Sequence, residues 1–216
     1  MKDIPVFTGA HGVATLVLRQ IPWSGCAYVL VRSVWTDAAA FLQECLGFCR
    51  ACGAKQVFAS WELEELPAEH AYDMLQMQME KADLPQAEPV AVQSVTKENA
   101  PAFLELFNRL FCPIPNAAAY TGQDLSRLTA EQTGFLVYRA GHPAALAEIS
   151  KQGLEAIAVV PQAKGLGYPL AATVLQMVPS KTITLKVAST NEPALRLYAR
   201  LGMEQTAVLS RWWKLW

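Results

Sequence analysis

The residues of this chain whose spacing most clearly suggests chemistry are the two glycines of the segment Pro161-Gln-Ala-Lys-Gly-Leu-Gly167. A strand-like run, Leu154 to Val160, ends at the proline, and an apolar run compatible with a helix, Leu170 to Val178, begins shortly after the second glycine. A strand that turns through glycines into a helix N-terminus presents several backbone N–H groups to one point. Such a point favours an anion, and a pyrophosphate fits it without any lysine. The segment therefore predicts a phosphate-binding loop.

Two other phosphate-binding folds match these glycines less well. A dinucleotide-binding fingerprint would need a third glycine where Leu170 stands, and an acidic residue at the end of the next strand, which instead ends Val187-Ala-Ser189. It would also need repeated βαβ units, whereas the strand before the loop belongs to a predicted meander. A P-loop is excluded because the chain has no Gly-Lys-Ser/Thr sequence.

The cysteines and histidines give no sign of a metal site. Five cysteines are an odd number, which argues against a disulfide framework. Cys45, Cys49 and Cys52 have a spacing that resembles the cluster-binding triplet of radical-SAM enzymes, but they also follow a helical repeat that would place all three thiols on one buried face. We therefore predict that they pack in the core. The histidines lack the partner spacing of metal ligands.

Composition and charge narrow the class of protein. The chain has 216 residues, 52% apolar and 17% charged, with a net charge of −1. A nucleic-acid-binding domain is normally basic, so no nucleic acid is expected as partner. The longest uncharged stretch, Gly165 to Ser180, is shorter than the ~20 residues of a membrane-spanning helix. We expect a soluble, cytoplasmic protein without a membrane partner, either a monomer or a homodimer.

The chain is predicted to have two parts, residues 1–85 and 86–216, joined by the proline-containing linker 83–89. The expected elements of the first part are strands over 13–20 and 26–34 joined by a hairpin turn at 22–25, a helix capped by Thr36-Asp37 and ending near Cys52, a strand over 55–61, and a methionine-rich amphipathic helix over 68–81.

The second part is expected to repeat strands and helices in a similar order. Its predicted elements are a strand over 90–95, helices over 96–111 and 124–130, a three-stranded antiparallel meander over 135–139, 144–150 and 154–160, a helix over 165–178, a strand over 182–188, a helix over 192–201 and a final strand or hairpin. The two parts read as distant repeats. The first has no glycine loop, and Asp37 at the matching helix start would repel a phosphate.

Residues 89–216 resemble the GNAT superfamily of acetyl-CoA-dependent N-acetyltransferases. Gln162-Ala-Lys-Gly-Leu-Gly167 fits the superfamily's Gln/Arg-x-x-Gly-x-Gly loop, and Asn191 to Met203 looks like its Asn-x-x-Ala-x-x-x-Tyr-x-x-x-Gly-Phe helix. The order of the predicted elements also agrees. The resemblance implies an α/β (α+β) fold with a mixed, mostly antiparallel twisted sheet flanked by helices, and a smaller N-terminal α/β half that is a degenerate GNAT-like or accessory domain.

The resemblance also implies a function, the transfer of an acetyl group from acetyl-CoA to a primary amine of a small molecule or peptide by direct attack. It assigns Tyr198 as the acid that protonates the departing thiolate. Pro169 departs from the family pattern, in which a small or apolar residue is usual. The residues implied to bind the cofactor are Ile157, Val159, Gln162, Lys164, Gly165, Leu166, Gly167, Tyr168 and Asn191.

The general base has two candidates among the strand carboxylates. Glu155 is in phase with Ile157 and Val159 on one strand and would face the thioester, and Glu148 on the neighbouring strand is the second candidate. A chain of water molecules is a third route for the proton. Because the base is open, a non-catalytic acyl-CoA-binding sensor or interaction module is the alternative function, and a structural partner protein is a third.

Overall fold

The chain divides into two compact units, each built from more than one segment of the sequence. The structure, a computed structural model, describes residues 5–62 and 64–216. The first unit comprises the described residues up to Leu75 with Ala188–Thr190 and Val208–Trp216, and the second comprises Gln76–Val187 and Asn191–Ala207. Residues 76–85, predicted to close the first part, thus belong to the second unit, and the C-terminal residues return to the first.

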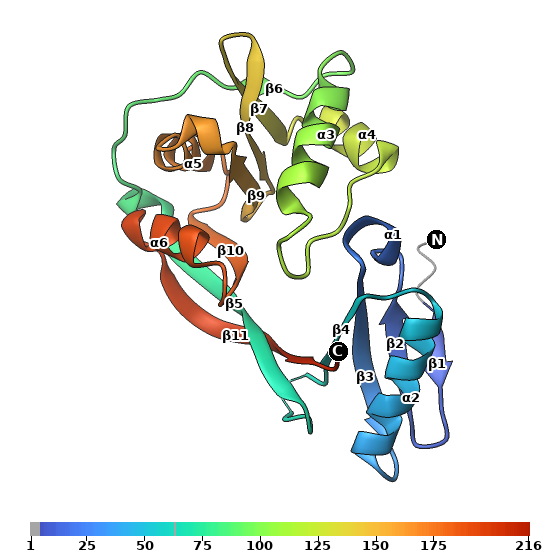
Figure 1. Cartoon of the computed structure of the whole chain (residues 1–216). Helices are drawn as coiled ribbons and strands as arrows, with labels where there is room; N and C mark the ends of the chain where they lie inside the picture. The colour runs from blue at the N-terminus through green and yellow to red at the C-terminus, as the bar shows by residue number, and fades with distance from the viewer. Residues whose placement is uncertain (1–4, 63) are drawn as a thin grey trace. The chain divides into compact units, whose positions relative to one another are not determined.

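The first unit is a sheet covered on one face by a helix (Figure 1). Its strands β1, β2 and β3 are antiparallel, β4 is parallel to β3, and the end of β11 pairs with β4. Phe41, Cys45 and Cys49 of α2 are fully buried against the sheet. Its elements are β1 (Val6–Thr8), β2 (Gly12–Val17), α1 (Ile21–Ser24), β3 (Cys26–Val34), α2 (Ala38–Ala51), β4 (Gln56–Ser60) and the start of β5 (Glu69–Glu80).

In the second unit the strand order is β11-β5-β10-β9-β8-β7-β6. The meander β7–β8–β9 is antiparallel and β10 is parallel to β9. Figure 1 shows α3 and α4 on one side of the meander and α5 on the other. The remaining elements are η1 (Lys81–Asp83), β6 (Gln93–Ser94), α3 (Ala100–Phe111), α4 (Gly122–Glu131), β7 (Gly134–Arg139), β8 (His142–Ile149), β9 (Gly153–Val159), η2 (Pro161–Ala163), α5 (Gly167–Leu175), β10 (Thr182–Ala188), α6 (Glu192–Arg200) and β11 (Glu204–Lys214).

The predicted methionine-rich helix over 68–81 is wrong, because this segment is the strand β5. Its burial alternates residue by residue, with Leu75, Met77 and Met79 buried and Gln76 and Gln78 partly exposed between them. That is the period of two expected of a strand. Methionine has no strong preference for strands, so the composition concealed the alternation.

Three smaller predictions also need correction. The expected hairpin forms, since β2 and β3 pair antiparallel, but its connection is a single helical turn, α1, followed by Gly25 with a φ of +75°. The expected strand over 90–95 is reduced to the two residues of β6. Cys52 lies exposed at the end of α2 while Cys45 and Cys49 are buried, because the helix stops before its next buried position.

The two units repeat one arrangement, an antiparallel meander followed by a helix and a parallel strand. In the first unit β3 and β4 pair along Cys26–Leu30 and Gln56–Ser60. In the second, the described residues of β9 and β10 pair only at Gly153 with Thr184 and at Leu154 with Leu185. Beyond these pairs the edge of β9 has no neighbouring strand on that side. Within the described residues, no helix is long and apolar enough to cross a membrane.

The contact between β9 and β10 depends on a glycine. A β-carbon at Gly153 would coincide with the carbonyl oxygen of Thr184 and lie 2.9 Å from its amide nitrogen. We predict that Gly153→Ala lowers the free energy of unfolding by about 1–3 kcal/mol or more, the cost of overpacking. Gly47→Ala is the control, since nothing lies within 4 Å of a β-carbon there and alanine favours the helix. Urea unfolding measures both, and equal stability of the two variants would contradict the prediction.

Candidate active site

A groove of about 350 Å³ opens where β9 separates from β10. Its walls come from four parts of the second unit: the end of α3 and the residues after it, the outer half of β9, the start of α5, and the first turns of α6. The lining residues are Leu110, Phe111, Ile114, Ile157, Ala158, Val159, Gly167, Asn191, Pro193, Ala194 and Leu197. The groove is therefore mostly apolar and runs along a strand edge.

The glycine loop lies at one end of this groove. Gly165 has a φ of +96°, in the region that favours glycine, and no atom lies within 4 Å of a β-carbon built there. The requirement for glycine at 165 is thus conformational. At Gly167 a β-carbon would make ordinary contacts with Val159 and Leu197, at 3.7 and 3.8 Å. Helix α5 begins at Gly167, so its first amides lack intrahelical acceptors and lie beside the loop.

Pro169 fits the first turn of α5 without interrupting it. The Leu170 N–H donates to the Leu166 carbonyl at 3.0 Å, so the helical hydrogen bonding continues past the proline. The Thr173 hydroxyl donates to the Pro169 carbonyl at 2.8 Å and accepts from the Val90 N–H at 3.0 Å. Proline is tolerated here because an N–H at this position would have no intrahelical partner. Its one effect on the loop is to remove an N–H donor from the first turn.

A second hollow of about 550 Å³ adjoins the groove, and three positively charged side chains are among the residues that line it. We call it the cationic hollow. The two share Val159, Gly167, Pro193 and Leu197. The additional lining includes Lys164 of the loop with Arg196 and Arg200 of α6. The Arg200 guanidinium lies 3.9 Å from the centre of the Tyr168 ring, a cation–π contact, and Arg196 pairs with Glu192 at 2.9 Å. This end of the groove is suited to a phosphate.

The two arginines were missed by the sequence reasoning. Their signal was present, because Arg196 and Arg200 are four residues apart and so lie on one face of a helix. That helix is capped by Asn191, whose side chain accepts from the Ala194 N–H at 3.3 Å, as its position in the motif suggested. Only the packing of α6 beside α5 shows that this face borders the glycine loop.

Tyr198 is buried on α6 and is not among the residues that line the groove or the cationic hollow. Burial raises the pKa of its hydroxyl to about 12. The phenol is protonated at neutral pH, as a tyrosine of ordinary pKa also is.

The structure does not bring Glu155 together with Ile157 and Val159. Glu155 is exposed and lines a different hollow of about 1010 Å³, together with Arg127, Lys151 and Met177. It sits one residue beyond the paired end of β9, whereas the groove opens farther along the strand. Gln162 is exposed in η2 and lines neither the groove nor the cationic hollow, and Leu166 is buried under the loop.

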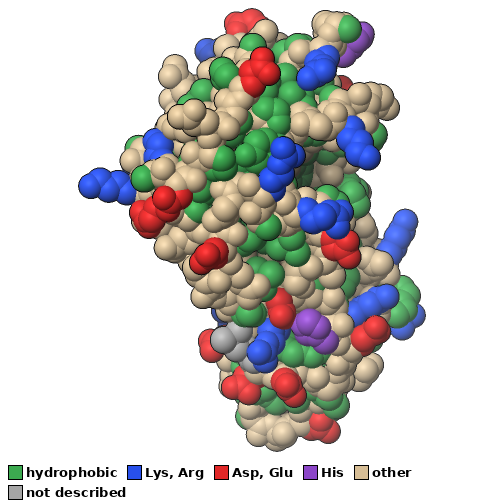
Figure 2. Space-filling view, turned by 90° about the vertical axis from the view of Figure 1, so that its left-hand side faces the viewer, with side chains coloured by type: hydrophobic (Ala, Val, Ile, Leu, Met, Phe, Trp, Pro, Cys, Tyr) green, Lys and Arg blue, Asp and Glu red, His purple; other side chains and the backbone are tan. Residues whose placement is uncertain are grey.

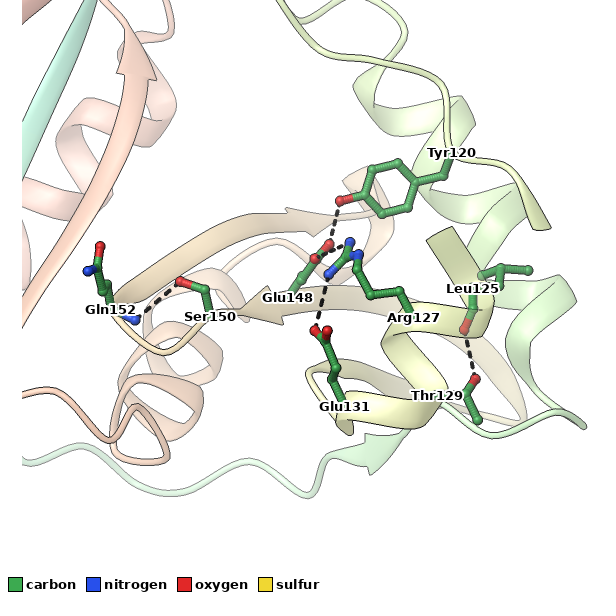
Figure 3. Close-up of polar contacts among 8 residues, drawn as sticks. All are labelled: Tyr120, Leu125, Arg127, Thr129, Glu131, Glu148, Ser150 and Gln152. Atoms are coloured by element: carbon green, nitrogen blue, oxygen red, sulfur yellow. Dashed lines mark hydrogen bonds and ion pairs between the residues drawn. The ribbon is translucent and has the colours of Figure 1, made fainter. Parts of the chain in front are cut away.

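Glu148 is buried on β8, with 1% of its surface exposed. Both of its carboxylate oxygens accept hydrogen bonds: Oε2 from the Tyr120 hydroxyl at 2.5 Å, and Oε1 from Arg127 Nη2 at 2.8 Å. Figure 3 shows the two donors converging on the carboxylate, with Arg127 also directed toward Glu131. Burial, and next the negative charge of Glu148, raise the pKa of Tyr120. Glu148 is not among the residues that line the groove.

On the face drawn in Figure 2, acidic and basic side chains are interspersed among apolar ones instead of forming a field of one sign. Among residues 5–62 and 64–216 no group of three or more His, Cys, Asp or Glu side chains is placed to hold a metal ion.

Solved structures resemble this chain in fold. A GNAT-family acetyltransferase from Colwellia psychrerythraea gives a TM-score of 0.55 at 14% identity, covering 97% of this chain and 84% of that one. A tandem GNAT protein of the clavulanic acid biosynthesis pathway gives 0.52 at 15% identity, covering 96% and 79%. The chain has the GNAT fold. The predicted fold class, a mixed sheet flanked by helices with a second GNAT-like half, is thereby confirmed.

The likeness extends to a protein of unknown function. A conserved protein from Staphylococcus epidermidis ATCC 12228 gives a TM-score of 0.59 at 13% identity and covers 99% of this chain and 94% of that one. No protein-family model matches the chain, and no curated protein matches it in sequence. At these identities the likeness establishes the GNAT fold.

The pKa of Tyr198 predicts a loss of stability at high pH. Its value is about 12 in the folded protein against the ordinary 10, so the folded state holds this proton more firmly. The stabilisation is complete below pH ~10 and is lost as the pH rises toward ~12, by up to about 1.4 kcal/mol per pH unit. Urea unfolding at several pH values above ~9 should show a shallower decline for Tyr198→Phe than for the wild type. Equal slopes would contradict the prediction.

Proposed function

We propose that this protein is an N-acetyltransferase that moves the acetyl group of acetyl-CoA to a primary amine of a small molecule or peptide by direct attack. The observation that carries the proposal is the separation of β9 from β10 beside the glycine loop. It creates an apolar groove with a cationic end. An extended thioester arm that carries amide groups and ends in phosphates has the complementary chemistry.

The residues of the chain have distinct tasks in this proposal. The amides of Lys164, Gly165, Gly167 and Tyr168 donate to the diphosphate, whereas the Leu166 N–H already donates to the Ala163 carbonyl at 3.2 Å. Lys164, Arg196 and Arg200 add positive charge. Ile157 and Val159 line the arm, and the edge of β9 that lacks a partner strand offers backbone hydrogen bonds to it. An amide near Val159 polarises the carbonyl. Acetyl-CoA, when bound, supplies the activated acyl group.

Proton transfer in this proposal involves Tyr198 and water. Tyr198 donates to the departing thiolate. Neither candidate carboxylate lines the groove. Glu155 lines another hollow, and Glu148 is buried with both of its oxygens accepting hydrogen bonds. We propose that water carries the proton away from the amine. An α-amine with a pKa near ~8 needs less help than a lysine side chain near ~10.4, so we expect acceptors of the first kind.

The absence of a carboxylate among the groove-lining residues also favours the alternative function, a non-catalytic acyl-CoA-binding sensor or interaction module. The two functions differ in turnover. A sensor binds CoA but releases no thiol from acetyl-CoA with any member of an amine panel, whereas the enzyme releases thiol in proportion to the acceptor. A thiol-release assay over small amines and peptide α-amines therefore decides between them.

The conformation of Gly165 predicts a specific loss of cofactor affinity. A side chain at a φ of +96° forces the loop to change, so that its amides no longer converge on one point. We expect Gly165→Ala to weaken CoA binding at least about tenfold, the equivalent of ~1.4 kcal/mol, in isothermal titration calorimetry.

Gly141→Ala is the matched control for this prediction. Gly141 has a φ of +79° and open space at its β-carbon, but it lies in the turn between β7 and β8 and lines neither part of the groove. Both variants carry the same kind of backbone strain, ~1–3 kcal/mol, so only Gly165→Ala should lose affinity. Equal affinity of both variants for CoA would rule out the loop as the diphosphate site.

The role of Tyr198 predicts a change in turnover without a change in binding. Tyr198→Phe keeps the ring and removes the proton donor, so kcat should fall at least about tenfold, toward the 10²–10⁴-fold that a positioned acid typically contributes. The affinity for CoA should stay within about twofold of wild type, because the phosphate-binding end is unaltered. Wild-type kcat in Tyr198→Phe would remove Tyr198 from the mechanism.

A further inference from the structure

Glu148 connects three elements of the second unit in a way that the acyl transfer proposed above does not use. Its side chain lies in phase with Leu146 on β8, on the face of the sheet that packs against α3. A buried carboxylate is costly unless hydrogen bonds compensate it. Tyr120, just before α4, and Arg127, within α4, provide that compensation. The carboxylate therefore fastens the start and the middle of α4 to the sheet (Figure 3).

Tyr120 is held at three points. The Asn108 side chain accepts from its backbone N–H at 2.8 Å and donates to its carbonyl at 3.1 Å. Its hydroxyl donates to Glu148, and its ring stacks on Phe107 with the ring centres 3.6 Å apart. Phe107 stacks in turn on Phe111, at 4.3 Å. A continuous row of three rings thus runs from the buried carboxylate to a residue that lines the groove.

The segment between α3 and α4 is attached to the sheet through Tyr120. It contains turns but no regular element over residues 112–121, and it contributes Ile114 to the groove beside Phe111. Its far end is fastened by Tyr120 and by the capping box of Thr121 with Asp124. Phe111 and Ile114 line the groove but not the cationic hollow. They therefore belong to the apolar end, away from the proposed diphosphate site, where an acceptor meets the thioester.

From this arrangement we propose that Glu148 is a positioning residue, which fixes Tyr120 and thereby places Phe111 and Ile114 as the wall that receives the acceptor amine. Glu148 acts through Tyr120 and takes no proton from the substrate. Its loss leaves the diphosphate end of the groove intact and disorders the acceptor end. The inference rests on the proposed acetyl transfer for its kinetic consequences, but its structural consequences hold without turnover.

The first test is hydrogen exchange in the free protein, which needs neither cofactor nor activity. Tyr120→Phe keeps the ring stack and removes the hydroxyl, and Glu148→Gln keeps the shape and removes the charge. Both should speed amide exchange over residues 112–121 at least about tenfold, the factor associated with one charge-assisted hydrogen bond, while exchange in α5 and α6 is unchanged. Glu131→Gln is the control, since Glu131 touches Arg127 at 3.7 Å but not Tyr120 or Glu148. Unchanged exchange in Tyr120→Phe would overturn the proposal.

The second test separates positioning from base catalysis. With an acceptor identified by thiol release, both variants should raise the acceptor KM about tenfold, keep kcat within about threefold, and leave CoA affinity and the pH profile of kcat unaltered. If Glu148→Gln instead lowers kcat more than about 100-fold at constant KM and removes the acidic limb of the profile, Glu148 is the base and the inference is wrong. Tyr120→Phe gives the same comparison if Glu148→Gln does not fold. If the wild type shows no turnover, the acetyltransferase proposal fails while the exchange experiment still tests the role of Glu148.

Discussion

The pairing of β9 with β10 at only two positions is the constraint on which the rest of the site depends. Gly153 allows the two backbones to approach at the start of β9, and beyond Leu154 the strands lie apart. A parallel pair that continued would satisfy the backbone groups of β9 and leave no groove. The first unit shows that outcome, because β3 and β4 pair along Cys26–Leu30. The same order of elements therefore produces a closed sheet in one unit and an open one in the other.

The N-terminus of the helix that follows the meander also differs between the two units, and only that of α5 is open to an anion. In the first unit Asp37 caps α2 and accepts the Ala40 N–H at 3.1 Å, so a carboxylate already occupies the position where an anion would bind. In the second unit Gly165 and Gly167 leave the start of α5 without an acidic cap. Strand separation and the glycine loop coincide only in the second unit. Because of these two differences, the separated strands and the uncapped helix start, we propose a cofactor site in the second unit and none in the first.

The buried carboxylate of Glu148 illustrates how a residue type suggests one role and its environment another. On a strand beside the candidate thioester site, a glutamate is a reasonable general base. With both oxygens accepting from Tyr120 and Arg127, it instead ties the start and the middle of α4 to the sheet. Glu155 is also outside the groove, because only the outer half of β9 borders the opening. Sequence spacing placed both carboxylates near the site but did not show which atoms they face.

What the sequence by itself determined is local: the glycine loop, the Asn191 cap, the meander and the helices that begin and end at recognisable residues. These depend on backbone conformation and on neighbours a few positions away, which the sequence displays directly. It misread β5, because methionine and glutamine favour helices by propensity although apolar and polar residues already alternate from Leu75 to Met79. The tertiary structure alone decided where β9 and β10 separate, which arginines border the loop, and that Glu148 is buried. Each of these requires residues far apart in the chain to be packed together, and no local pattern specifies that packing.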